Sequence, residues 1–122
     1  MDITEQNLKA DDILKQIFGY SSFRNGQEEI VKNILGGKQT LAIMPTGAGK
    51  SLCYQIPAIA SEQKTVVISP LISLIENQVT DLRENGVKVE KLHSNQSSQN
   101  RVTSWNNFKN GECKILYICL LY

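Results

Sequence analysis

The stretch Ala42-Ile-Met-Pro-Thr-Gly-Ala-Gly-Lys-Ser51 decides the fold, because it joins an apolar segment to an apolar helix through two glycines. It predicts a buried strand over residues 39–44, a tight loop and a helix that begins near Lys50. The glycines allow the loop to turn its N–H groups inward, and the helix N-terminus adds partial positive charge. This is the layout of a phosphate-binding P-loop, in which Lys50 contacts the β- and γ-phosphates and the Ser51 hydroxyl holds Mg²⁺.

The strict P-loop pattern G-x-x-x-x-G-K-[ST] has a glycine where this chain has Met44. The alternative interpretation is a glycine-rich surface turn before an ordinary helix. We favour nucleotide binding, because strand, loop, Lys-Ser pair and helix follow one another in the order that the motif requires. Lys50 is the predicted catalytic residue, and Ser51 is the predicted metal ligand. The predicted nucleotide-binding residues of this segment are Met44, Pro45, Thr46, Gly47, Ala48, Gly49, Lys50 and Ser51.

Composition limits the function classes. The chain has 122 residues, 41% of them hydrophobic and 20% charged, with a formal net charge of +1. It therefore forms one domain at most, and any nucleic-acid site must be local rather than a consequence of overall charge. Three cysteines without a C-x-x-C pair argue for a reducing compartment and against a disulfide framework or zinc site. No apolar run approaches the ~20 residues of a membrane span, so we expect a cytoplasmic protein with no membrane partner.

The apolar pattern alternates between helical and strand periods along the chain. β-branched runs predict strands, and glycines predict the helix ends. Pro57 is expected to cut the P-loop helix. Strands that alternate with helices indicate an α/β fold with a mostly parallel sheet flanked by helices. We predict disorder over residues 1–7, helices over 8–18, 25–35, 71–85 and 95–110, and further strands over 64–69, 87–92 and 113–121.

Three ordered segments resemble the first motor domain of RecQ-type DNA helicases, which belong to superfamily two. Phe18-Gly-Tyr-Ser-Ser-Phe-Arg-Asn-Gly-Gln-Glu-Glu-Ile30 looks like that family's adenine-recognition motif, and Met44-Pro-Thr-Gly-Ala-Gly-Lys-Ser-Leu-Cys-Tyr-Gln-Ile-Pro57 looks like its Walker A motif. Ser69-Pro-Leu-Ile-Ser-Leu-Ile-Glu-Asn-Gln-Val79 looks like the next motif, which is associated with single-stranded DNA. The resemblance implies a RecA-like P-loop NTPase fold, ATP and Mg²⁺ as cofactors, and single-stranded or partly duplex DNA as the partner.

The first of these segments contains candidate adenine contacts. The Gln27 amide can donate and accept at once, so it can read the adenine edge. The Arg24 guanidinium and the Tyr20 ring can stack on the purine. The alternative is that Tyr20 and Phe23 pack on the first helix and that Gln27 is a solvated residue at a helix N-terminus.

The third segment contains candidate DNA contacts. Ser hydroxyls and N–H groups at a helix N-terminus suit a DNA phosphate. The alternative is a strand-to-helix turn whose hydroxyls cap the helix, and both interpretations can hold together. The candidate nucleic-acid residues are Ser69, Pro70, Leu71, Ser73, Asn77 and Gln78.

Two further features have simpler interpretations. His93 is the only histidine and has no visible ligand partners, so we favour a loop or packing role over metal binding. Trp105 and Phe108 could stack on bases, but their helical spacing is more typical of a core, and we favour the core.

The hydrolytic part of the resembled site has no counterpart here. That family holds Mg²⁺ through a D-E-x-H segment, whereas the last Asp of this sequence is Asp81. The resemblance implies an apparently truncated domain whose missing strands belong beside the P-loop strand. We therefore expect exposed apolar edges, self-association, weak ATP binding and no DNA unwinding by this chain alone. The alternative is a non-catalytic nucleotide-binding or interaction module; the upstream Gln motif disfavours an unrelated P-loop kinase or GTPase.

Overall fold

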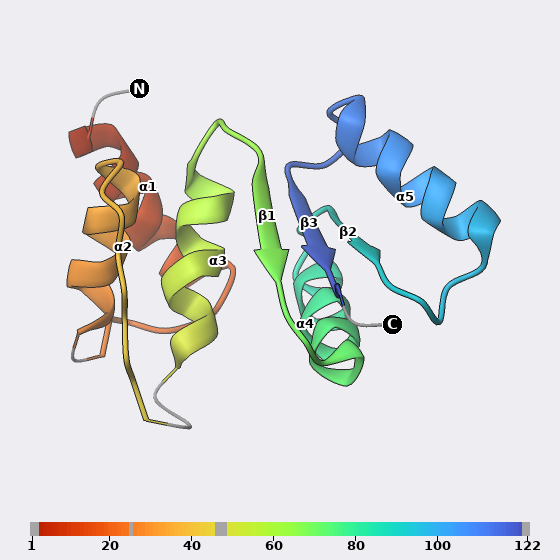
Figure 1. The fold of residues 1–122 in the computed structure, drawn as a ribbon. Helices are drawn as coiled ribbons and strands as arrows, with labels where there is room; N and C mark the ends of the chain where they lie inside the picture. The colour runs from red at the N-terminus through yellow and green to blue at the C-terminus, as the bar shows by residue number, and fades with distance from the viewer. Residues whose placement is uncertain (1–2, 25, 46–48, 121–122) are drawn as a thin grey trace. The chain divides into compact units, whose positions relative to one another are not determined.

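The protein forms two compact units, residues 1–62 and residues 63–122, in a computed structural model (Figure 1). The structure describes residues 3–24, 26–45 and 49–120. In the second unit strands and helices alternate around a parallel sheet, which confirms the predicted α/β class. Among the described residues, every helix is too short or too polar to cross a bilayer.

The first unit is built from three helices, α1 (Ile3–Gln16), α2 (Gln27–Leu35) and α3 (Lys50–Ala60). One face of α1 is apolar because its small and branched residues recur at helical spacing. That face packs against one buried residue of α2 and two of α3. The buried core of the unit consists of Ala10, Ile13, Leu14, Val31, Ile56 and Ala60.

Two predictions about the helices of this unit need correction. Helix α1 begins at Ile3, so residues 3–7, which were expected to be disordered, are helical. Helix α3 passes through Pro57 and ends at Ala60 instead of being cut. Pro57 removes one backbone hydrogen bond, but burial of Ile56 and Ala60 on the core side offsets this loss.

The strand predicted over residues 39–44 is absent; the segment has no regular secondary structure. Leu41 is 88% exposed and Ile43 is 89% exposed, so neither side chain is buried as predicted. A strand needs a neighbour for its backbone N–H and C=O groups. The described part of this unit contains helices and connecting segments but no second strand, so the apolar pattern has nothing to pair with.

The second unit is a parallel sheet with two helices. Its elements are β1 (Thr65–Ile68), α4 (Ile72–Glu84), β2 (Val89–Leu92), α5 (Ser98–Lys109) and β3 (Ile115–Ile118). The strand order is β1-β3-β2, and Ile115 lies opposite both Thr65 and Val89. The elements agree in type and order with those predicted, and each is shorter than predicted.

The central strand β3 forms the core of this sheet. Leu116 and Tyr117 are almost fully buried, as are the inward residues Ile75 and Val79 of α4. On α5, Phe108 is buried with Cys113 and Leu116, which confirms the core role predicted for it. Trp105 is 48% exposed, so the same prediction is wrong for Trp105. Its ring still lies 6.2 Å from that of Phe108, at the rim of the cluster.

Candidate nucleotide and nucleic-acid sites

The start of α3 has the local properties of an anion site. Gly49 precedes the helix with φ 74° and ψ 39°, in the left-handed region that favours glycine. The first turn of α3 contains no acidic residue, and Lys50 is exposed while Ser51 is half-buried. The helix dipole and the Lys50 ammonium therefore act in the same sense. Thr46, Gly47 and Ala48, also predicted to bind nucleotide, lie outside the described residues.

The Gln27 amide joins the predicted adenine segment to the start of α3. Its Nε2 donates to the Gly49 carbonyl at 3.1 Å, and its Oε1 accepts from the Arg24 N–H at 2.8 Å. Gln27 is 1% exposed, so the interpretation as a solvated residue is wrong. Two segments 22 residues apart are thus held together by one buried side chain.

Cys53 lies under the same region. Its Sγ is 3.9 Å from the Met44 sulfur and 4.0 Å from the Gly49 carbonyl oxygen. One thiol therefore contacts two residues of the predicted P-loop, Met44 at its start and Gly49 just before α3. Burial raises the pKa of Cys53 above its ordinary value, and the hydrogen bond to the backbone opposes that shift only in part. The group is a neutral thiol near pH 7 and acts as a packing residue.

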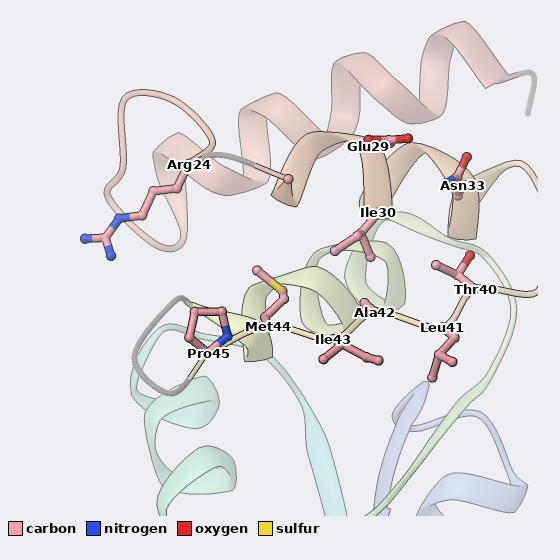
Figure 2. A pocket seen from close by; sticks show the side chains of 11 residues that line it. Arg24, Glu29, Ile30, Asn33, Thr40, Leu41, Ala42, Ile43, Met44 and Pro45 are labelled. Carbon is pink, nitrogen blue, oxygen red and sulfur yellow. The ribbon is translucent and has the colours of Figure 1, made fainter.

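An open groove of about 890 Å³ lies between α2 and residues 40–45. Figure 2 shows Ile30 and Ile43 on its apolar side, with Glu29 and Asn33 on α2 and the Arg24 guanidinium directed outward. The sequence predicted only a helix for Glu29 and Asn33 and no role in a groove. Their four-residue spacing, which places them on one face of that helix, is the signal that could have indicated it. The groove is lined by Arg24, Gly26, Glu29, Ile30, Asn33, Thr40, Leu41, Ala42, Ile43, Met44 and Pro45.

The groove brings together only some of the predicted nucleotide-binding residues. Arg24, Met44 and Pro45 line it, whereas Gln27 and Lys50 do not. Tyr20 is half-exposed elsewhere on the first unit, so the stacking role is not supported by a shared cavity. The roles predicted for these residues stay predictions.

Two of the candidate DNA residues have structural partners. Ser69 is buried, and its Oγ accepts the Leu71 N–H at 3.3 Å, so it closes the turn before α4. Gln78 Oε1 accepts the hydroxyl proton of the buried Tyr117 at 2.8 Å, which joins α4 to β3. Ser69 therefore confirms the predicted turn, but among the described residues no side chain caps α4, so the predicted capping by hydroxyls is wrong.

The other candidate DNA residues are exposed. Ser73 and Asn77 lie one turn apart on α4, where neighbouring turns place them on a common face. Pro70 and Leu71 are exposed just before the helix. The exposed candidates thus form one continuous segment from the end of β1 to the second turn of α4.

A charged cluster that sequence reasoning missed lies beside this segment. Glu76 of α4 accepts from Lys91 Nζ at 2.6 Å and meets His93 Nε2 at 2.5 Å. The Lys91 hydrogen bond holds the pKa of Glu76 below its ordinary value; burial opposes this shift, and His93 contributes to it. His93 is 6% exposed, which confirms the packing role predicted for it. No local sequence signal predicts the cluster, because Lys91 and His93 are 15 and 17 residues from Glu76 along the chain.

Comparison with known proteins places these features in context. The sequence profile described as DEAD/DEAH box helicase matches residues 24–119. The Haemophilus influenzae protein named ATP-dependent DNA helicase RecQ is 47% identical to this chain. The aligned region covers 89% of this chain and 18% of the relative. The protein of the same name from Pasteurella multocida is 48% identical over 97% of this chain and 19% of the relative. The one from Bacillus subtilis is 46% identical over 90% of this chain and 19% of the relative.

These matches confirm the resemblance to RecQ-type helicases that the three motifs indicated. The chain spans less than a fifth of the length of each of these curated relatives.

Proposed function

Because the chain belongs to the DEAD/DEAH box helicase family, we propose that it serves in a RecQ-type ATP-dependent DNA helicase, in which ATP binding and hydrolysis drive translocation and unwinding. The contact between Gln27 and Gly49 is the main support for the proposal, because it brings the segment that resembles the adenine-recognition motif to the start of the predicted P-loop helix. Three relatives named ATP-dependent DNA helicase RecQ match the chain at 46–48% identity, which supports the proposal. A cytoplasmic location belongs to the same proposal.

ATP with Mg²⁺ is the cofactor that fits the start of α3. An exposed lysine at the amino end of a helix without acidic residues suits a polyphosphate. Lys50 binds the β- and γ-phosphates in this proposal and offsets the charge that develops on them when the terminal phosphoryl group is transferred. The Ser51 hydroxyl is one oxygen ligand for the metal, and Met44 and Pro45 border the loop.

Recognition of the base is assigned to the segment before α2. Tyr20 and Arg24 are both exposed and present a ring and a guanidinium plane to a purine. The Gln27 amide already bonds to the Gly49 carbonyl and the Arg24 N–H, so an adenine that binds to it would share this side chain with both backbone contacts. Base recognition is thereby linked to the backbone at the start of α3.

Single-stranded or partly duplex DNA is the proposed partner of the segment between β1 and α4. Uncharged hydroxyl and amide groups can bind DNA phosphates without reading the base sequence. Ser73 and Asn77 are assigned this role because they are exposed, with Pro70 and Leu71 beside them. Ser69 and Gln78 contribute by holding the turn and the helix in place.

Replacing both Ser73 and Asn77 by Ala is expected to weaken single-stranded DNA binding by at least about twenty-five-fold. Each hydrogen bond to a phosphate contributes at least about 1 kcal/mol, which corresponds to about five-fold in affinity. Fluorescence anisotropy with a labelled oligothymidine measures the dissociation constant at fixed salt. Asn106→Ala, an exposed amide of α5 in the same unit, is the matched control and should bind like wild type. Equal affinity of the double variant and the control would contradict the DNA assignment.

A second copy of the chain is the partner that we propose for the open edge of the sheet. β1 lies at the edge of the sheet and pairs with β3 alone among the described strands. Val66 is 48% exposed and Ile68 is 64% exposed, and edge strands of this kind promote association. Sedimentation velocity should show dimers that Val66→Lys removes. Val102→Lys, at an exposed valine of α5, should leave them intact. Dimers that survive both changes rule out this edge.

A further inference from the structure

His93 is a buried titratable residue that the predicted ATP and DNA sites do not use. It follows β2 directly, on the way to α5 (Figure 1). Three hydrogen bonds close the turn that it begins: the His93 N–H donates to Gln96 Oε1 at 2.9 Å, the Gln96 N–H to the His93 carbonyl at 3.3 Å, and the Asn95 N–H to His93 Nδ1 at 3.2 Å. Residues 93–96 therefore form an ordered turn centred on one imidazole.

The two ring nitrogens of His93 have opposite roles. Nδ1 accepts a backbone N–H from Asn95, so it carries no proton. The neutral ring then carries its proton on Nε2, which donates to the Glu76 carboxylate. The charged groups around the ring are Glu76 from α4 and Lys91 from β2; Arg101 from α5 binds the turn at the Gln96 carbonyl. Both ring nitrogens are satisfied only in this tautomer.

The turn lies at the same edge of the sheet as the candidate DNA segment. β1 and β2 both run parallel to β3, so their carboxyl ends meet at one edge, where α/β proteins bind ligands. Glu76 is a neighbour of Ser73 on the surface of α4, at a three-residue separation. Ser94 and Asn95 are exposed on the turn. The contact between His93 and Glu76 therefore brings the turn that contains Ser94 and Asn95 to α4, next to Ser73.

The charge of Glu76 is compensated at this edge. A bare carboxylate beside a DNA backbone would repel the phosphates. Here Lys91 donates to one carboxylate oxygen and His93 to the other. The edge therefore presents hydroxyl and amide groups with little local negative charge.

We propose that His93 is a positioning residue: as its neutral Nε2–H tautomer it ties the turn of residues 93–96 to α4, and it thereby extends the single-stranded DNA surface from Ser73 and Asn77 to Ser94 and Asn95. The DNA part of this inference rests on the proposed function. The tautomer part concerns the chain alone.

The tautomer is measured without DNA. Long-range ¹H–¹⁵N NMR on the ¹⁵N-labelled chain at pH 8 distinguishes a protonated from a bare ring nitrogen. The expected spectrum shows a protonated Nε2, a bare Nδ1 and an Asn95 amide protected from hydrogen exchange. A protonated Nδ1, or an unprotected Asn95 amide, overturns the proposal.

Two substitutions separate the two contacts of the ring. His93→Asn keeps an acceptor at the position of Nδ1 and loses the reach to Glu76, whereas His93→Gln keeps a donor near Glu76 and loses the Asn95 acceptor. Each should lower oligothymidine affinity about five-fold, and Ser94→Ala with Asn95→Ala should lower it by at least as much. If His93 acts through the turn, adding either His93 substitution to the Ser94→Ala, Asn95→Ala variant should cause no further loss.

The outcomes distinguish this inference from the proposed function. One outcome is that the Ser73→Ala, Asn77→Ala double variant binds oligothymidine more weakly, whereas the Ser94→Ala, Asn95→Ala double variant binds like wild type. The extension of the surface then fails, and the proposed function stands. Additive losses mean that His93 does not act through Ser94 and Asn95, which also overturns the inference. Absence of oligothymidine binding by the wild-type chain overturns both the DNA surface and its extension, whatever the tautomer. A thermal melt of each variant checks that it remains folded.

Discussion

Gly49→Ala is expected to lower the free energy of unfolding of the first unit by about 3 kcal/mol. An alanine in the left-handed region costs about 1–2 kcal/mol. Its Cβ would also meet the Gln27 Nε2 atom within 2.4 Å, so the buried amide would have to leave the Gly49 carbonyl. An unsatisfied buried polar group costs a further 1–3 kcal/mol. Urea denaturation followed by circular dichroism, with hydrogen exchange of the α1–α3 amides, measures the loss.

Gly19→Ala is the matched control for this prediction. Gly19 has φ 76°, close to that of Gly49, but a Cβ there meets nothing within 4 Å. Its variant should pay the backbone cost of about 1–2 kcal/mol and no more. The difference between the two variants isolates the contact between Gln27 and the start of α3. Equal destabilisation by both substitutions would show that this contact contributes nothing to stability.

Lys50→Ala is expected to abolish the stabilisation of the chain by Mg-ATP. A ligand at 100 times its dissociation constant adds about 2.7 kcal/mol of stability to a folded state that binds it. Lys50 supplies the charge for the β- and γ-phosphates in the proposed site, and its loss leaves only backbone groups and the Ser51 hydroxyl. Thermal melts with and without Mg-ATP measure the shift for each protein.

Lys38→Ala controls for the loss of a lysine from the same unit, since Lys38 is also exposed and lies before the groove segment. It should keep the full shift. A wild-type melt that Mg-ATP leaves unchanged at saturating concentration would favour the alternative, a non-catalytic interaction module. An equal shift in wild type and Lys50→Ala would place nucleotide away from the start of α3.

The local part of the structure was predictable from the sequence. A β-branched run identified β1, an apolar run identified β3, and apolar spacing with glycine stops identified α2 and α4. These signals depend on residues within one turn or one strand. The order of these elements was sufficient for a parallel α/β sheet. The motifs around Gln27, Lys50 and Ser73 were likewise sufficient for the helicase family, which the match over residues 24–119 confirms.

Only the tertiary structure decided how distant residues are used. The segment 39–44 has a strand pattern but no strand, because strand formation requires a neighbour that no local pattern can supply. Gln27 is a buried link to Gly49, and Gln78 is held by Tyr117, although both were predicted as ligand contacts. Glu76, Lys91 and His93 form a cluster across two elements. Polar side chains of one type bind ligands when exposed and hold the fold when buried, and burial is a property of the packed chain rather than of the residue.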